Sequence, residues 1–385
     1  MNCKELFEKI EELYPKYIKV WEDVCNIESP TNYKQGVDKV CCYFKALAEE
    51  KGWYTEVFKQ EISGDALCII MNPESEEKPI CLSGHMDTVH PLGLFGNPPV
   101  RIEAGKIYGP GVTDCKGGIV SAFLAMDALS TLGFCKRPVK LILQSDEETG
   151  SKTSNKETVK FILEKAKNTI AFFNCESCKE EKAWTVSLER KGILRYKFTV
   201  TGKAAHSSFC YEGANAILEA AYKIIELEKY KEPDGITCNC GLISGGTAAN
   251  TVAKECSFVA DIRFSTEKEM EEVAEIVQKI AGENKFPETK CECTLVSDRP
   301  PMELKEMNKE FFERLNCICD ECGLELLKHE KRNGGSDAAY ITQANIPCID
   351  NIGVLGGRIH SQEEYALLKS LQTSAEYLAA FIYSL

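Results

Sequence analysis

The sequence predicts an α/β fold: a mixed, largely parallel sheet flanked by helices, with a ferredoxin-like domain inserted into it. Two observations lead to this prediction. In the first half of the chain, short apolar runs alternate with a helical pattern, as in strand–helix–strand units. From about residue 187 the order becomes strand–helix–strand–strand–helix–strand, that of a ferredoxin-like domain. The length of 385 residues agrees with two domains.

The elements of the first domain follow from hydrophobic spacing. Apolar residues at helical spacing predict helices over residues 5–27 and 117–132. Apolar runs predict the strands of its sheet, at residues 66–71, 80–82, 139–143 and 170–173. After the insertion the same domain resumes with a helix, a strand and a helix, at residues 308–322, 324–328 and 363–382.

The inserted domain is predicted over residues 187–298, so residues 1–186 and 299–385 together form the first domain. Its strands are expected at residues 193–201, 237–244, 252–264 and 290–296. Helical patterns separate them, at residues 214–229 and 267–281.

Composition restricts the class of protein. A hydrophobic content of 44% and a charged content of 27% are typical of a soluble globular protein. A net charge of −13 argues against nucleic acid or an anionic membrane as the main partner. The charged N-terminal helical pattern does not resemble a signal peptide, and no apolar run is long enough to span a bilayer. We therefore expect a cytoplasmic protein.

Cysteine is abundant, with 20 residues scattered along the chain. The CxxC pairs at 175–178 and 319–322 lack the second pair of a zinc ribbon. In a reducing compartment these side chains are expected to be free thiols that pack as small hydrophobic groups. A structural metal or redox role is the less favoured alternative.

His85 and Asp87 end an apolar strand-like run and are the most informative pair in the chain. A spacing of two on a strand places both side chains on one face. A carboxylate beside an imidazole can fix its tautomer and leave the other nitrogen free to bind a metal. An ordinary strand end with a helix-capping aspartate is the alternative.

Further polar residues follow the predicted strands or precede a helix. Glu147 and Glu148 come directly after a strand and would project in different directions, so one can bind a metal while the other polarises a water. Glu176 ends the next strand. Asp114 lies in a glycine-rich segment and could instead be a simple N-cap, whereas His360 could cap or pack at a helix N-terminus.

Two imidazoles and three carboxylates without an obligatory thiolate suit zinc, cobalt or manganese. A carboxylate that bridged two ions would create a two-metal hydrolytic site, in which a metal-bound hydroxide attacks a polarised carbonyl.

The motifs taken together resemble the M20 family of dinuclear metallopeptidases and deacylases, above all its bacterial glutamate carboxypeptidase-type members. Ser-Gly-His-Met-Asp-Thr-Val and Asp-Glu-Glu-Thr-Gly are two of these motifs, at residues 83–89 and 146–150. The others lie in the family's order and span nearly the whole chain, at residues 109–118, 201–207, 334–340 and His360.

The resemblance implies a role for each matching residue. Asp114 would bridge two Zn²⁺ ions per subunit, with Co²⁺ or Mn²⁺ as possible substitutes, and a cis peptide would join it to Cys115. Asp87 would orient a ligand, and Glu147 would be the general base for the bridging hydroxide that attacks the carbonyl. The remaining metal ligands would be His85 and Glu176 on one ion, and His360 and Glu148 on the other.

The inserted domain of this family is a lid that also dimerises. The resemblance therefore implies a homodimer in which His206 reaches the partner's site and stabilises the oxyanion. Positions that match substrate contacts are Asn250, Arg263, Arg299 and Gly335. An arginine fork suits a free α-carboxylate, although either arginine could be a surface ion-pair partner.

The predicted function is hydrolysis of an amide bond adjacent to a free carboxylate by a zinc-dependent carboxypeptidase. Its substrate would be a small peptide or an N-acyl amino acid. A glutamate at position 176 agrees better with the carboxypeptidase and deacylase members than with several dipeptidases. The alternatives are an N-acyl amino acid deacylase or dipeptidase with the same site, and a binding or scaffolding relative without metal.

Overall fold

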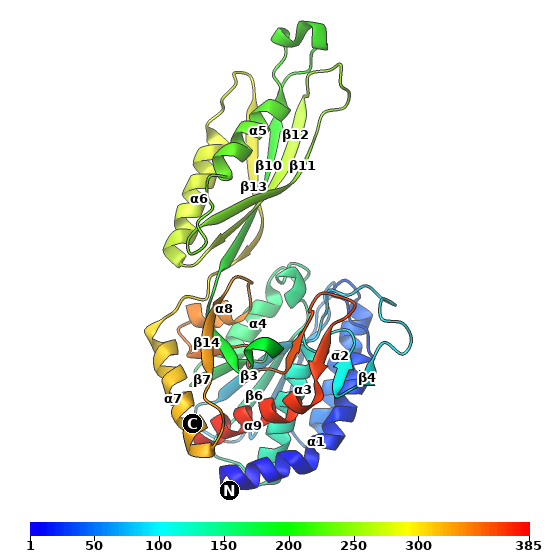
Figure 1. Cartoon of the computed structure of the whole chain (residues 1–385), viewed down its shortest axis with the longest axis vertical. Coiled ribbons are helices and arrows are strands. Elements are labelled where there is room, and N and C mark those ends of the chain that lie inside the picture. Colours follow the sequence, from blue (N-terminus) through cyan, green and yellow to red (C-terminus); the bar gives the residue numbers. More distant parts are fainter. The chain divides into compact units, whose positions relative to one another are not determined.

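The computed structural model describes residues 1–385 and divides into two compact units (Figure 1). The first unit comprises Met1–Leu188, Leu304–Lys331 and Tyr340–Leu385. The inserted unit comprises Glu189–Glu303 and Arg332–Ala339. The expected insertion at 187–298 did not include the second of these segments, which follows the insertion in sequence. It belongs there because Gly335 packs on Arg299: a Cβ atom at Gly335 would lie 2.7 Å from Cδ of Arg299.

The first unit is built on an eight-stranded sheet. Its central strands β6, β3, β7 and β15 are parallel, whereas β1, β2 and β9 join antiparallel to their neighbours. The sheet is therefore mixed with a parallel centre, as predicted. The strands, in order across the sheet, are β1 (Tyr54–Phe58), β2 (Ala66–Met71), β6 (Val139–Gln144), β3 (Ile80–His85), β7 (Ala171–Asn174), β15 (Cys348–Asp350), β9 (Thr185–Arg190) and β14 (Lys328–Arg332).

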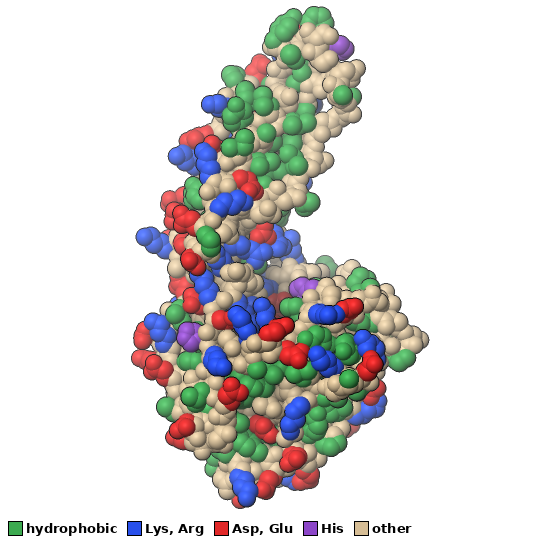
Figure 2. All heavy atoms as spheres, in the orientation of Figure 1, with side chains coloured by type: hydrophobic (Ala, Val, Ile, Leu, Met, Phe, Trp, Pro, Cys, Tyr) green, Lys and Arg blue, Asp and Glu red, His purple; other side chains and the backbone are tan.

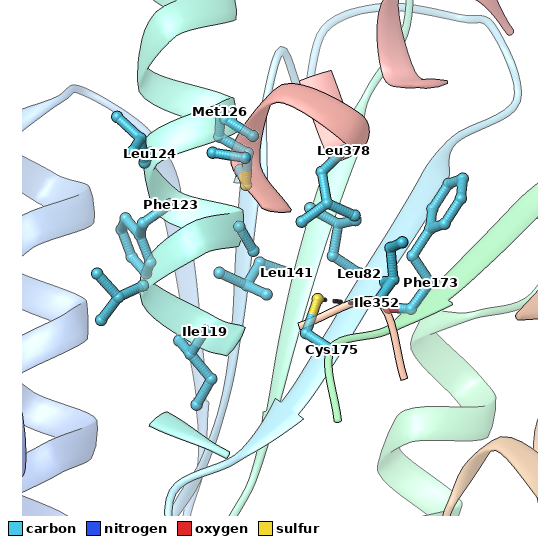
Figure 3. Packing of buried hydrophobic residues seen from close by; sticks show 14 of the residues in the cluster. Leu82, Ile119, Phe123, Leu124, Met126, Leu141, Phe173, Cys175, Ile352 and Leu378 are labelled. Atoms are coloured by element: carbon cyan, nitrogen blue, oxygen red, sulfur yellow. Dashed lines mark hydrogen bonds between the residues drawn. The ribbon is translucent and has the colours of Figure 1, made fainter. Parts of the chain in front are cut away.

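Alternate residues of the central strands face two different helix layers. In Figure 3, Leu82 of β3 and Leu141 of β6 lie with Phe123 of α3 and Leu378 of α9, all of them buried. On the opposite face of β6, Lys140 donates to the carbonyl of Lys165 at the end of α4. The helices of the first unit are α1 (Cys3–Cys25), α2 (Lys34–Glu50), α3 (Lys116–Thr131), α4 (Glu157–Lys165), α7 (Glu306–Cys322) and α9 (Leu368–Ser384), with α8 (Ala338–Gln343) across the boundary of the units.

A small five-stranded sheet brings the C-terminal part of the chain beside residues 101–108. Because residues 365–367 pair with β5, the last helix begins at Leu368 and not at residue 363 as predicted. The strand predicted at 324–328 is also wrong in position, since β14 begins at Lys328. The strands of this sheet, in order, are β4 (Arg101–Glu103), β5 (Lys106–Tyr108), β17 (Tyr365–Leu367), β16 (Leu355–Gly357) and β8 (Cys178–Lys179).

The inserted unit has the predicted ferredoxin-like order. Its four strands are antiparallel in the order β11-β12-β10-β13, and apolar side chains at alternate positions of β10 are buried. Two helices pack on this sheet and complete its core. The elements in chain order are β10 (Gly192–Thr201), α5 (Ala216–Leu227), β11 (Thr237–Gly245), β12 (Glu255–Phe264), α6 (Glu267–Gly282) and β13 (Lys290–Arg299).

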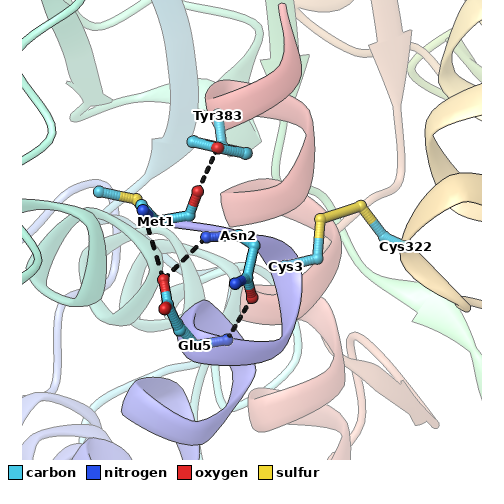
Figure 4. The surroundings of a disulfide bond; sticks show 6 residues. All are labelled: Met1, Asn2, Cys3, Glu5, Cys322 and Tyr383. Carbon is cyan, nitrogen blue, oxygen red and sulfur yellow. Dashed lines mark hydrogen bonds and ion pairs between the residues drawn. A yellow bond between two sulfur atoms is a disulfide. The ribbon is translucent and has the colours of Figure 1, made fainter.

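One pair of cysteines forms a disulfide, which corrects the expectation that all of them are free. Cys3 at the start of α1 is bonded to Cys322 at the end of α7, with Cα atoms 5.6 Å apart (Figure 4). The two residues are separated by 319 positions, and cysteine spacing alone cannot pair such distant residues. The other cysteines are free. No helix is both long and apolar enough to cross a membrane.

Candidate metal centre

Parallel strands carry three of the five predicted ligands to one edge of the large sheet. His85 is the last residue of β3, and Glu176 lies two residues beyond the end of β7. Glu147 and Glu148 begin a short 3-10 helix, η1 (Glu147–Thr149), which follows β6. Because β6, β3 and β7 run in the same direction, their carboxyl ends meet at this edge.

The ring of His85 is fixed on one side and open to ligands on the other. Its Nδ1 lies 3.0 Å from the backbone carbonyl oxygen of Asp87 and 3.3 Å from Oδ1 of the same residue. A proton on Nδ1 can serve these acceptors, so that Nε2 is the nitrogen that would bind a metal. Nε2 lies 3.1 Å from Oδ1 of Asp114 and 3.7 Å from Oε1 of Glu176. His85 is therefore oriented as a metal ligand would be.

Asp114 presents its two oxygens to two different histidines. Oδ1 faces His85, whereas Oδ2 lies 3.3 Å from Nε2 of His360. The same nitrogen of His360 lies 3.4 Å from Oε2 of Glu148. The result is two donor groups that share one carboxylate. The Asp114–Cys115 peptide bond is cis, as the family resemblance implied.

These spacings fit metal ions held between the donors. With zinc–ligand bonds of about 2.0–2.2 Å in tetrahedral geometry, two ligands of one ion lie roughly 3.3–3.6 Å apart. The four histidine–carboxylate distances range from 3.1 to 3.7 Å. The donors are imidazole nitrogens and carboxylate oxygens, the set that zinc, cobalt and manganese accept. The residues therefore fit a pair of such ions.

Cys115 also lies at this centre. Its sulfur and the donor atoms of His85 and Glu176 are all within 4.8 Å of one another. The sulfur already accepts a hydrogen bond from the backbone N–H of His85 at 2.9 Å. Cys115 is not among the predicted ligands, and this contact gives the thiol a separate role in holding the strand end.

The protonation of the acids shows how strongly the site attracts positive charge. Burial, reinforced by Asp114, raises the pKa of Glu148 to about 8, and burial also holds the pKa of Glu176 well above its usual range. Hydrogen bonds to Asp114 and Glu148 raise the pKa of His360 to about 10. Burial works against ionisation of Asp114, but His360 and His85 outweigh it and keep the pKa of that carboxyl well below its usual value. Clustered acids of this kind bind either protons or cations.

Asp87 contacts both His85 and the short helix η1. Its Oδ1 accepts from the backbone N–H of Glu147 at 3.1 Å, and Oδ2 accepts from that of Glu148 at 3.2 Å. Oδ2 also accepts from the hydroxyl of Thr31 at 2.6 Å. The buried carboxylate therefore positions η1 as well as His85. Sequence reasoning missed Thr31, because the segment that precedes α2 carries no motif.

His360 differs from the other predicted ligands in its exposure. It lies in the turn between β16 and β17, and its side chain is 53% exposed, whereas that of His85 is 2% exposed. Its φ of 61° is in the left-handed region, which non-glycine residues seldom occupy. Such a backbone conformation is common at functional sites, where it aims a side chain.

The predicted substrate residues of the inserted unit form two groups. His206 and Asn250 are exposed and adjacent, since Ser207 donates its N–H to the carbonyl of Asn250 at 3.0 Å. Arg263 and Arg299 flank Ile193 across three neighbouring strands.

Gly335 and Asp261 lie beside these two arginines, and we refer to the four residues as the arginine group. Gly335 packs on Arg299, as described above, and Arg263 donates to Asp261 at 2.5 Å. The ten residues of β10 separate this group from the His206 group by roughly 30 Å at about 3.3 Å per residue.

Residues 81–384 match the model of peptidase family M20/M25/M40. The chain belongs to this family. It is 27% identical to carboxypeptidase G2 of Pseudomonas sp. (strain RS-16) over 383 residues, which cover 97% of this chain and 90% of that protein. It is 26% identical to succinyl-diaminopimelate desuccinylase of Rickettsia felis over 374 residues, covering 92% and 96% of the two chains.

The fold of this M20 protein is also that of solved family members. The YXEP protein of Bacillus subtilis, described as a dinuclear metal binding peptidase from the M20 family, superposes with a TM-score of 0.72 at 14% identity. The match covers 97% of this chain and 99% of that one. The predicted family and fold class are confirmed, and the chain is an M20-type metallopeptidase.

Proposed function

We propose that this protein is a dinuclear zinc-dependent carboxypeptidase, which hydrolyses an amide bond adjacent to a free carboxylate. The observation that carries the proposal is the arrangement of Asp114, whose two oxygens face His85 and His360 separately. Each histidine also faces a further carboxylate, that of Glu176 or Glu148. One ion would be held by His85, Asp114 and Glu176, and the other by His360, Asp114 and Glu148.

The residues around the ligands suit amide hydrolysis. When bound, the two ions would polarise the substrate carbonyl and lower the pKa of the attacking water. Glu147 precedes a proposed ligand and is held by Asp87 through its backbone N–H. Its carboxylate would take the proton from the water and pass it to the leaving amine. Asp87 would keep both His85 and η1 in place without touching an ion.

A free carboxylate on the substrate would be recognised by the arginine group of the inserted unit. Arg263 and Arg299 flank one residue of β10, and the backbone of Gly335 packs beside Arg299. Guanidinium groups bind carboxylates with two parallel hydrogen bonds. The name of carboxypeptidase G2 agrees with this reading. The similarity to succinyl-diaminopimelate desuccinylase favours the second candidate, an N-acyl amino acid deacylase, and a dipeptidase with the same site is the third.

We also propose that the enzyme works as a homodimer through the inserted unit. His206 and the arginine group lie at opposite ends of β10, too far apart for both to contact one small substrate. His206 and Asn250 would therefore serve the partner's site, where His206 would stabilise the oxyanion. Hydrophobic side chains gather over α5 in Figure 2. The exposed apolar residues of α5 and of the edge strand β11 are Ile217, Leu218, Tyr222, Ile225, Leu242 and Ile243.

The experiment that tests this function starts from metal-free protein. Chelator is used to remove metal, Zn²⁺ or Co²⁺ is restored, and hydrolysis is measured on peptides that end in Glu, Asp or a neutral residue and on N-acyl amino acids. We expect two ions per subunit and cleavage of at least one carboxylate-bearing amide. Cleavage of N-acyl amino acids alone would replace the carboxypeptidase with the deacylase. Absence of any cleavage by the metal-restored protein would overturn both.

A further inference from the structure

Glu364 and His90 lie beside residues 111–114, the segment that carries Asp114, and neither is a proposed metal ligand or catalytic residue. Both side chains are buried, with Glu364 fully inaccessible and His90 4% exposed. His90 is one of only five histidines in the chain. A buried carboxylate is costly unless it is paired and hydrogen-bonded, so the partners of Glu364 indicate what it does.

The carboxylate of Glu364 accepts four hydrogen bonds. Oε1 accepts from the backbone N–H groups of Thr113 at 2.9 Å and Asp114 at 3.1 Å. Oε2 accepts from the backbone N–H of Gly111 at 3.3 Å and lies 2.7 Å from Nε2 of His90. Because a carboxylate can only accept, the proton of this last bond resides on Nε2 of His90.

These bonds hold the backbone that delivers the bridging carboxylate. Three of the four donors are the backbone N–H groups of residues 111, 113 and 114, so Asp114 itself is held directly. The backbone carbonyl of Glu364 also accepts from the N–H of Gly109 at 3.3 Å. Glu364 follows His360 by four residues and lies 250 residues from Asp114. One side chain therefore connects the segment of the bridging aspartate with the segment of the exposed histidine.

We propose that Glu364 and His90 are positioning residues for the dinuclear centre. Glu364 fixes the backbone of residues 111–114, so that the two oxygens of Asp114 face His85 and His360, and His90 fixes Glu364 through its Nε2–H. The proposal rests on the metal ligands assigned in the proposed function. Removal of a partner that orients a metal ligand typically weakens metal binding by about 10- to 100-fold.

The first test compares two buried glutamates that each hold a loop. Glu364→Gln keeps the shape of the side chain but presents an NH₂ group where one oxygen accepted. Glu219 of the inserted unit is also fully buried and accepts from the backbone N–H groups of Lys285 and Phe286. We expect Glu364→Gln to lower the affinity for Co²⁺ by about 10- to 100-fold, measured by calorimetry and by the visible Co²⁺ spectrum. Glu219→Gln should lower the thermal stability and leave Co²⁺ binding unchanged.

The second test asks whether His90 acts through its N–H. His90→Gln retains a side-chain N–H donor, whereas His90→Phe retains a ring of similar size without one. We expect His90→Phe to weaken Co²⁺ binding and His90→Gln to restore much of the lost affinity. His329→Phe is the control, because His329 is exposed and stacks edge-on against Phe312. This pair decides the question on its own if Glu364→Gln does not fold.

Three results with these variants would overturn the proposal. The first is wild-type Co²⁺ affinity in both Glu364→Gln and His90→Phe. The second is an equal loss in Glu219→Gln, which would make the effect one of general stability. The third is equal weakening in His90→Phe and His90→Gln. If the wild-type protein binds two ions and cleaves no amide, the proposed function fails while this inference stands. If the wild-type protein binds no ion, both fail.

Discussion

Most of the proposed ligands at the edge of the large sheet and the His206 group of the inserted unit are organised in opposite ways. At the sheet edge, His85, Asp87 and Asp114 are buried, and hydrogen bonds from several segments fix each of them. In the inserted unit, His206 and Asn250 are exposed. A single chain therefore completes the metal centre, whereas the proposed substrate contacts of the inserted unit are divided between the two ends of β10. Under the proposed function, metal binding would belong to one subunit and turnover would need two.

The largest effect at the sheet edge should distinguish the roles of its two adjacent glutamates, one as general base and the other as metal ligand. Glu147→Ala should lower kcat by about 10²- to 10⁴-fold, the usual contribution of a general base, and should retain both ions. Glu148→Ala should instead lose an ion, because Glu148 faces His360 at the second donor group. The measurements are kcat and zinc content per subunit. A Glu147→Ala protein that keeps most of its rate at full metal occupancy would remove Glu147 from the mechanism.

The second prediction tests whether the inserted unit acts across subunits. His206→Ala should lower kcat by about 10²- to 10³-fold, as does loss of an oxyanion donor elsewhere. We expect partial recovery when His206→Ala subunits are mixed with Glu147→Ala subunits. Random assembly in a symmetric dimer gives half heterodimers with one working site each, or about a quarter of the wild-type activity. No recovery in heterodimers that have been isolated would show that His206 serves its own subunit, and the contrast between the regions would disappear.

A smaller effect on metal binding is expected at Asp87, which contacts His85 and η1 but no proposed ion. Asp87→Asn places an NH₂ group against the N–H of Glu147 or Glu148 and should weaken metal binding by about 10- to 100-fold without emptying the site. Thr31→Val is the matched control, since it removes only one of the hydrogen bonds to the same carboxylate. Chelator competition followed by metal analysis measures both variants. Equal affinities in wild type and Asp87→Asn would assign Asp87 to the fold alone.

The sequence predicted the site best where potential metal ligands directly follow an apolar strand pattern. Parallel strands bring their carboxyl ends together, so polar residues after three apolar runs predicted the cluster of His85, Glu148 and Glu176 before any distance was known. The contacts of Glu364 could not be predicted in this way, because a single glutamate carries no sign of a loop 250 residues away. The same holds for the Cys3–Cys322 disulfide, which depends on the meeting of two helix ends.

The smallest prediction concerns pH and tests whether the sheet-edge donors bind protons and metal in competition. In the metal-free protein the pKa of His360 is about 10 and that of Glu148 about 8, so both are protonated at pH 7. Metal must displace these protons, and its apparent affinity should therefore rise with pH, by about tenfold per unit for each proton released. The rise should weaken above pH 8, where Glu148 is already ionised.

Calorimetry of Zn²⁺ binding in buffers of different ionisation enthalpy counts the released protons directly. Glu148→Gln should release one proton fewer at pH 7, because the amide cannot ionise. His329→Phe is the control: its imidazole is exposed and belongs to neither donor group, so the proton count should not change. Proton release that is the same in wild type and Glu148→Gln would show that Glu148 does not exchange its proton for metal. Protons and metal ions would then not compete for Glu148 at the sheet edge.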